Sequence, residues 1–363
     1  MSNGGKRLLS KESTFFGRIL SEYNSGIEYE NTVRGFFCLI ETPEEIVELS
    51  KEDSIHFLAH ELSHLLGYNL TEAEEGVFVD WGGDSLANSG QCPIIVDLKE
   101  AVIGIMVIGS STMTKKIVGK IKEISGIYVL QFNNDLLKKK AQQLDSITEF
   151  NYEFSMVGLA TDEKILNSGL VKGGYCHQEY EYKTSHFPDS FCLKNLSGYP
   201  RVDSIAQLTL YANGEFSVKE YDQTSFITNY LTLKSLIRDK VGSWLNHHII
   251  QWLPDEKHGN FAIHGQPLIF DLPINYPEIT KLSQKILSSE KLLNILVLYV
   301  KSLQVDKYIV FADADSGKTV DVSLNHNLIR IKLNHPLGVP AALRLEYFIQ
   351  QHLYADLQYY KLN

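Results

Sequence analysis

Long apolar segments are absent from this sequence. No run approaches the roughly eighteen uncharged apolar residues that a membrane-spanning helix needs. The N-terminal stretch MSNGGKRLLSKESTFFG also lacks the apolar core of a secretory signal. We therefore expect a protein without a membrane span that works in the cytoplasm, with a non-classical export route left open.

Cysteine and positive charge are scarce as well. Four cysteines stand at irregular spacing in 363 residues, which is not the pattern of a disulfide framework, so reduced thiols are expected. The 34 Lys and Arg residues are outnumbered by 44 Asp and Glu, which leaves a net charge of −10, and they form no basic stripe. Nucleic acid is therefore not an expected partner.

What the sequence does contain is typical of a soluble globular protein, with 44% hydrophobic and 21% charged residues. The length fits two or three domains. Mixed helix and strand periodicities predict an α+β fold in three parts. These are a metal-site region with a βαβ unit (1–148), an irregular aromatic connecting segment (149–204), and an α+β domain with antiparallel hairpins for substrate recognition or regulation (205–363).

The first part begins with an amphipathic pattern over 9–24 and a short buried strand over 33–40. A helix over 51–66 follows. Ser50 is its expected N-cap, and Gly67 stands where a left-handed C-cap is expected. A second helix is expected from Thr71, because Thr71-Glu72-Ala73-Glu74 matches a capping box.

From residue 102 the pattern changes to strand (102–109), helix (112–125), strand (126–132) and helix (135–144). Strand, helix and strand in about thirty residues predict a βαβ unit with a parallel pair of strands. Further on, a hairpin is expected over 208–220, with Asn213-Gly214 as a type I′ turn. Helices near 225–250, 277–303 and 339–360 should surround the strands KYIVFAD, KTVDVSL and LIRIKL.

The chemistry concentrates in HFLAHELSHLLGYNLTEAEE, residues 56 to 75. His60 and His64 are four residues apart on the expected helix, so both imidazoles can reach one ion. Glu61 follows the first histidine and could take a proton from a metal-bound water without being a ligand. The uncharged residues around the motif suit a helix that lines a catalytic cleft.

The segment FLAHELSHLLGY resembles the active-site helix of the zincin metallopeptidases, over about residues 50–85. The metzincin continuation is not met, because its third histidine is replaced by Leu70. The gluzincin pattern takes its third ligand from a Glu on the following helix, and the cluster Glu72, Glu74 and Glu75 lies there. The stretch that begins at Glu75, Glu-Gly-Val-Phe, is similar to the surroundings of that ligand, so the resemblance favours Glu75, then Glu74, then Glu72.

The resemblance implies a zinc-dependent peptidase that cuts a protein or peptide substrate. Zinc would be held by His60, His64 and Glu75, and Glu61 would be the catalytic base. A regulatory ligand or partner could act on the C-terminal domain. The alternative is a non-catalytic interaction, effector or adaptor protein, in which the motif is incidental or structural and these side chains are ordinary helix residues. The peptidase hypothesis requires the proposed zinc ligands to converge in an accessible cleft.

Two other groups of possible metal ligands match known metal sites less well. Cys176, His177, His186 and Cys192 could close a structural zinc site, but their spacing matches no known zinc pattern. Asp313, Asp315 and Gly317 lack the later ligands of a calcium loop, and a hairpin turn explains them.

Overall fold

A computed structural model describes residues 32–41, 50–80, 92–144, 146–154, 191–199, 207–219, 223–255, 260–272, 276–303, 306–325, 328–353 and 357–359. The expected helix over 9–24 and most of the aromatic segment 149–204 lie outside these residues. Helices and antiparallel sheets together confirm the α+β class.

The larger sheet has ten strands among the described residues, and every pairing in it is antiparallel. In order across the sheet, its strands are β2 (Thr71–Glu74), β3 (Val77–Asp80), β4 (Ile94–Asp97), β5 (Ile103–Gly109), β1 (Thr32–Ile40), β10 (Glu215–Lys219), β9 (Gln207–Tyr211), β8 (Phe191–Tyr199) and β7 (Ser146–Phe154), with β6 (Ile127–Val129) paired to the end of β1.

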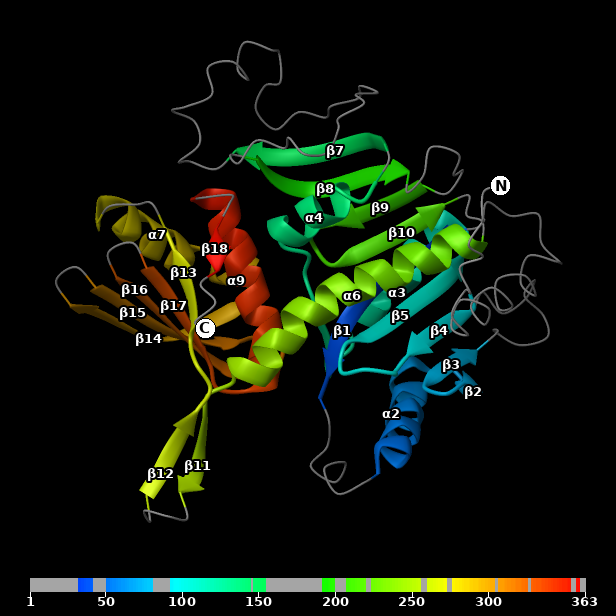
Figure 1. The fold of residues 1–363 in the computed structure, drawn as a ribbon, viewed down its shortest axis with the longest axis horizontal. Coiled ribbons are helices and arrows are strands. Elements are labelled where there is room, and N and C mark those ends of the chain that lie inside the picture. Colours follow the sequence, from blue (N-terminus) through cyan, green and yellow to red (C-terminus); the bar gives the residue numbers. More distant parts are fainter. Residues whose placement is uncertain are drawn as a thin grey trace, which may run out of the picture.

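The central strand β1 is buried along nearly its whole length because helices cover both faces of this sheet. Phe37 belongs to a core that includes α6 (Gln223–His247), whereas Phe36 belongs to a second core with α2 (Lys51–Leu66) and α3 (Ser111–Lys122). Strands covered on both faces lose the alternation of polar and apolar residues. Figure 1 shows α6 crossing the front of the sheet.

The elements of the expected βαβ unit are present as β5, α3 and β6, but the two parallel strands are not paired with each other. Both strands pair antiparallel with β1, which lies between them. The two strands therefore run in the same direction without touching. Sequence spacing could not reveal this, because the intervening strand comes from an earlier segment of the chain.

The hairpin of β9 and β10 is confirmed, but the type I′ turn is wrong. Only Gly214 has a positive φ, 88°, and its N–H donates to the Tyr211 carbonyl at 3.0 Å. A three-residue loop of this kind combines an ordinary turn with one left-handed residue. A Cβ at Gly214 would lie 2.3 Å from the Leu130 carbonyl oxygen, so the site requires glycine.

In the part of the chain that the structure describes, the smaller sheet has six strands, all paired antiparallel. The expected helix over 277–303 is correct only in its first half. Asn294 adopts a left-handed conformation (φ 52°) that ends the helix, and the aliphatic run after it forms an edge strand. The strands in order are β14 (Ile295–Leu303), β15 (Asp306–Asp313), β16 (Thr319–Asn325), β17 (Leu328–Leu333), β13 (Leu268–Asp271) and β18 (Gln358–Tyr359); the helices on their buried face include α7 (Tyr276–Ser288) and α9 (Val339–His352), with α8 (Glu290–Leu293) next to α9.

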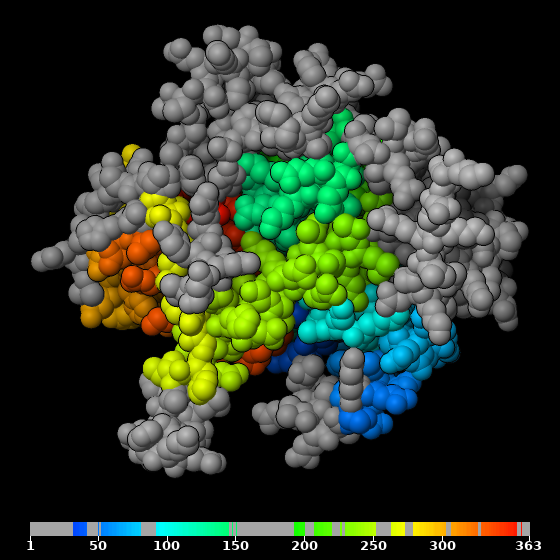
Figure 2. Space-filling view, in the orientation of Figure 1, coloured from blue at the N-terminus to red at the C-terminus, as the bar shows by residue number. Residues whose placement is uncertain are grey.

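One continuous core joins the two sheets. Buried side chains of α6 and α9 pack with apolar residues of both, and Figures 1 and 2 show α6 between the two sheets. Because β9 and β10 belong to the larger sheet, this sheet includes strands from both sides of the segment 149–204, and β8 comes from within that segment. The remaining described elements are α4 (Asn134–Ala141), the 3₁₀ helix Pro336–Gly338 and the hairpin of β11 (Gln251–Asp255) and β12 (Asn260–His264).

Candidate functional site

The motif helix α2 forms as its sequence predicts. The Ser50 hydroxyl accepts a hydrogen bond from the Asp53 N–H at 3.2 Å, and Gly67 ends the helix with φ 67°. Ala59 and Leu62 are buried against the sheet, with neighbouring aliphatic residues packed around them. The opposite side of the helix, at the blue margin of the molecule in Figure 2, therefore faces outward.

This outward side carries the histidines of the motif. The His60 and His64 rings are in contact, edge to face, with centroids 4.6 Å apart. The Glu61 carboxylate lies 3.7 Å from His60 Nδ1. The side chains of His60 and Glu61 are 69% and 46% exposed, so these groups are accessible from solvent. The helix thus brings both histidines and Glu61 together in the expected way.

The segment after α2 is not the expected helix but the hairpin of β2 and β3. Thr71 donates its hydroxyl to the Val79 carbonyl at 3.1 Å instead of capping a helix, and Gly76 turns the chain with φ 72°. The reason is the buried run Val77 to Val79, which packs as a strand against β4. A capping box is a local pattern, and here strand pairing overrides it.

The hairpin distributes the acidic residues along its length. Glu72 lies 3.5 Å from His56 Nε2, and Glu74 lies 3.7 Å from Lys99 Nζ. Glu75 is exposed in the turn and lines a hollow with His56 and Glu52. Within the described ranges, no three His, Cys, Asp or Glu side chains are placed to share a metal ion. Glu75 therefore stays a predicted ligand.

Two hollows flank the β2–β3 turn and share Ile55, Glu74, Glu75 and Gly76 in their walls. The one beside His56 has a volume of about 690 Å³. The other, which we call the inner pocket, has about 520 Å³; its walls are Ile55, Glu74, Glu75, Gly76, Asp97, Lys99, Glu100, Leu231, Lys234, Ser235 and Arg238.

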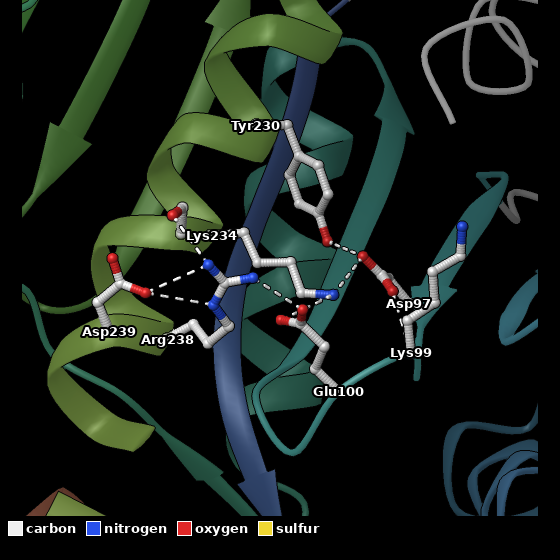
Figure 3. A network of polar contacts seen from close by, with 8 residues as sticks. Asp97, Lys99, Glu100, Tyr230, Lys234, Arg238 and Asp239 are labelled. Carbon is white, nitrogen blue, oxygen red and sulfur yellow. Dashed lines mark hydrogen bonds and ion pairs between the residues drawn. The ribbon is translucent and has the colours of Figure 1, made fainter. Parts of the chain in front are cut away.

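The inner pocket borders a buried polar network between the end of β4 and α6 (Figure 3). Asp97, only 2% exposed, accepts hydrogen bonds from Tyr230 Oη at 2.7 Å and from Lys234 Nζ at 2.8 Å. Burial, reinforced by the negative charge of Asp97, raises the pKa of Tyr230 well above its usual value of 10. Tyr230 therefore remains a proton donor to Asp97 throughout the physiological range.

The network continues toward the surface through Glu100. Arg238 Nη1 donates to Glu100 Oε1 at 3.0 Å, and Lys234 Nζ lies 4.0 Å from Glu100 Oε2. Arg238 also contacts Asp239 on its own helix at 3.2 Å. Figure 3 shows the Lys234 ammonium group between the carboxylates of Asp97 and Glu100.

Sequence reasoning missed this network. One sequence feature could have indicated the network. Tyr230, Lys234 and Arg238 are spaced at four-residue intervals, which places three polar residues along one side of α6. Asp97 is the last residue of a strand that was not predicted, and Glu100 lies three residues after it. Nothing in the sequence therefore pointed to their partners more than a hundred residues away.

The cysteines and the histidines near them were the other candidate site residues of the sequence. Cys176, His177 and His186 lie outside the described residues, and Cys192 is buried in β8. Burial raises the pKa of the Cys38 and Cys92 thiols, which makes them poor nucleophiles.

None of the helices in the described part of the chain combines the length and apolar character needed to cross a bilayer.

Comparison of the chain with protein-family models, curated proteins and solved structures finds no match in any of the three. Function is therefore inferred from the residues and their geometry.

Proposed function

We propose that the protein is a zinc-dependent peptidase that hydrolyses a peptide bond in a protein substrate, with His60 and His64 as metal ligands. The observation that carries this proposal is the pair of imidazoles in contact on the exposed side of α2, with Glu61 beside them. Both caps and the buried face of the helix hold this arrangement in place.

The donor set fits zinc at two positions. Two accessible imidazoles one helical turn apart are common zinc ligands, and histidine is neutral enough near pH 7 to bind a metal. The third donor proposed from the resemblance, Glu75, lies in the turn beside His56 rather than next to His64. Binding through Glu75 would require a movement of the β2–β3 turn toward the histidines.

Each side chain of the motif would then have one task. Zinc, when bound, would supply an acidified water and polarise the scissile carbonyl. His60 and His64 would hold the ion. Glu61, which is accessible and adjacent to His60, would accept a proton and pass it to the leaving amine. Ser63 supports the helix exit, because its hydroxyl donates to the Ala59 carbonyl at 2.9 Å and accepts from the Leu70 N–H at 3.3 Å.

The test is the zinc content per chain after equilibration with zinc and gel filtration. We expect about one zinc in wild type and in Glu61→Gln, and loss of the metal in His60→Ala and His64→Ala. Glu61→Gln should lower peptidase activity by roughly 10²–10⁴-fold, the usual contribution of a general base.

His56→Ala is the matched control, because His56 lies one turn earlier on the same helix and pairs with Glu72. It should keep its zinc. Metal-free wild type under these conditions, or a His60→Ala variant that retains zinc, would contradict the proposal.

A second candidate function, a non-catalytic interaction protein, is favoured by the edge strand β14. Among the described residues it pairs only with β15, and its other edge is open. The large exposed apolar residues of β14 are Leu296, Leu298, Tyr299 and Val300, and Leu292 of the preceding helix α8 is exposed as well. An open apolar edge can pair with another strand, and Lys301 is the only charged residue of β14, so an antiparallel second copy would meet little repulsion.

If this candidate is right, light scattering should give the mass of a dimer for wild type at tens of micromolar and of a monomer for Leu298→Lys. Leu65→Lys, at an exposed leucine on α2, should remain dimeric. A wild-type protein that is monomeric over the whole concentration range would remove the support for this candidate.

A further inference from the structure

The hairpin of β11 and β12, which we call the arm, stands apart from the two larger sheets. Among the described strands, β11 and β12 pair only with each other, and Figure 1 shows the arm extending away from both sheets. A two-stranded hairpin that stands alone is at best marginally stable in water. The arm would therefore gain stability if another surface covered one of its faces.

The strand register places the apolar residues of the arm on one face. Trp252 pairs with Ile263, and Pro254 pairs with Phe261. Residues that are paired across two strands, or that stand two apart along one strand, lie on the same face. The positions on the other face are Gln251, Leu253, Asp255, Asn260, Ala262 and His264. Ile263 is 58% exposed, so the apolar face is uncovered at this position.

The base of the arm, in contrast, is fixed to the core. The Ile250 N–H donates to the Leu333 carbonyl at 2.7 Å, and the Gln266 N–H donates to the His247 carbonyl at 3.0 Å. His248, only 5% exposed, donates through Nδ1 to the Gln266 carbonyl at 2.9 Å. These bonds hold both ends of the arm against α6 and β17. Because the arm is held in place before it meets a partner, docking would cost little conformational entropy.

The same chain carries a second uncovered apolar surface. Among the described residues, eight large apolar side chains are exposed; apart from Leu65 and Met113, they are Ile263 in the arm and five residues of α8 and β14. The stretch 292–300 contains no charged residue, whereas the whole chain has a net charge of −10. Two copies of an acidic protein repel each other least where they meet through uncharged surfaces.

We propose that the apolar face of the arm packs on the exposed apolar residues of α8 and β14 in a second copy of this chain. The second copy returns the same contact, and a two-fold axis closes the assembly at two chains. The proposal rests on the second candidate function, and it specifies which part of the second copy covers the open edge.

The size of the arm requires this reciprocity. A face of four residues is small compared with the roughly 800 Å² that each partner buries in a standard interface. In a reciprocal dimer each chain contributes both its arm and its β14 surface, so the buried area is counted over two contacts. A single arm seated on one β14 surface would leave the other pair of surfaces exposed.

The experiment is light scattering of the full chain at tens of micromolar, with Ile263→Lys, Leu298→Glu and an equimolar mixture of the two variants. We expect the mass of a dimer for wild type. Each variant alone should have the mass of a monomer, because its dimer would bury an unpaired charge in both contacts. The mixture should return to the dimer mass. One contact of the mixed dimer is unchanged, and in the other the introduced lysine and glutamate face each other.

His264→Lys is the matched control, because His264 is the exposed neighbour of Ile263 on the opposite face of the arm. It should remain dimeric, and circular dichroism should show that all variants are folded. A dimeric Ile263→Lys beside a monomeric Leu298→Glu would overturn the role of the arm and leave the second candidate function standing. A mixture that stays monomeric, or a wild-type mass above that of two chains, would also overturn the proposal. A monomeric wild type would overturn both.

Discussion

Asp97→Ala is expected to lower the free energy of unfolding by about 3–5 kcal/mol, the usual result of removing one partner of a buried ion pair. Lys234 would keep a buried positive charge, and Tyr230 would lose the acceptor 2.7 Å from its hydroxyl. Both residues are at most 6% exposed, so water cannot readily replace the carboxylate. Urea unfolding followed by circular dichroism measures the change.

Two comparisons make this result specific. Asp239→Ala removes a carboxylate that is 66% exposed and contacts Arg238; it should change stability by less than about 1 kcal/mol. The triple variant Asp97→Leu, Tyr230→Phe and Lys234→Met should recover much of the loss, because apolar residues of similar volume can replace a buried charged network. If Asp97→Ala is as stable as Asp239→Ala, the network does not support the fold.

Lys140→Met is expected to raise the free energy of unfolding at pH 7 by up to about 3 kcal/mol. Lys140 is buried in α4, where Asn229 Oδ1 accepts a hydrogen bond from it at 3.2 Å, and burial lowers its pKa from 10.5 to about 8. A shift of that size corresponds to about 3 kcal/mol of unfavourable charge burial. Methionine of similar length removes the charge without leaving a cavity.

The pH dependence has a definite sign. Below about pH 8 the lysine is charged in both states, and its burial opposes folding in full. Between about pH 8 and 10.5 the unfolded chain binds more protons than the folded one, so wild-type stability should rise with pH through this residue. Lys140→Met lacks this contribution, and the difference between the two proteins should therefore shrink toward pH 10.5.

Urea unfolding at pH 7, 8.5 and 10 tests this expectation. Lys139→Met is the control, because Lys139 is the exposed neighbour on the same helix; it should follow wild type at every pH. A Lys140→Met variant that is less stable than wild type at pH 7, or a difference that does not change with pH, would show that the buried ammonium group is well compensated.

Local features of the fold were predictable from the sequence. Three such features are the caps of α2, the hairpin of β9 and β10, and the strands β15, β16 and β17 of the smaller sheet. Each depends on residues close to one another in the chain. So does the contact of His60 with His64, since helical spacing alone places them on one side. These predictions hold because each feature is determined by interactions between residues close in the sequence, and these interactions are present in the folded chain.

Other predictions failed where a distant segment decided the outcome. The capping box at Thr71 forms a strand because Val77 to Val79 pair with β4, and β5 and β6 are separated because β1 lies between them. In both cases sheet pairing, which the periodicity of a single segment cannot reveal, outweighed the local pattern.

The sequence by itself determined the α+β class, the motif helix and the residue types of the proposed zinc site. Only the tertiary structure decided where Glu75 lies, which helices cover which sheet, and that Asp97 meets Tyr230 and Lys234 from a helix more than 130 residues away. Hydrogen bonds and ion pairs of this kind act over a few ångströms. Residues so far apart in the chain come within that distance only after the sheet has assembled and α6 has packed across it.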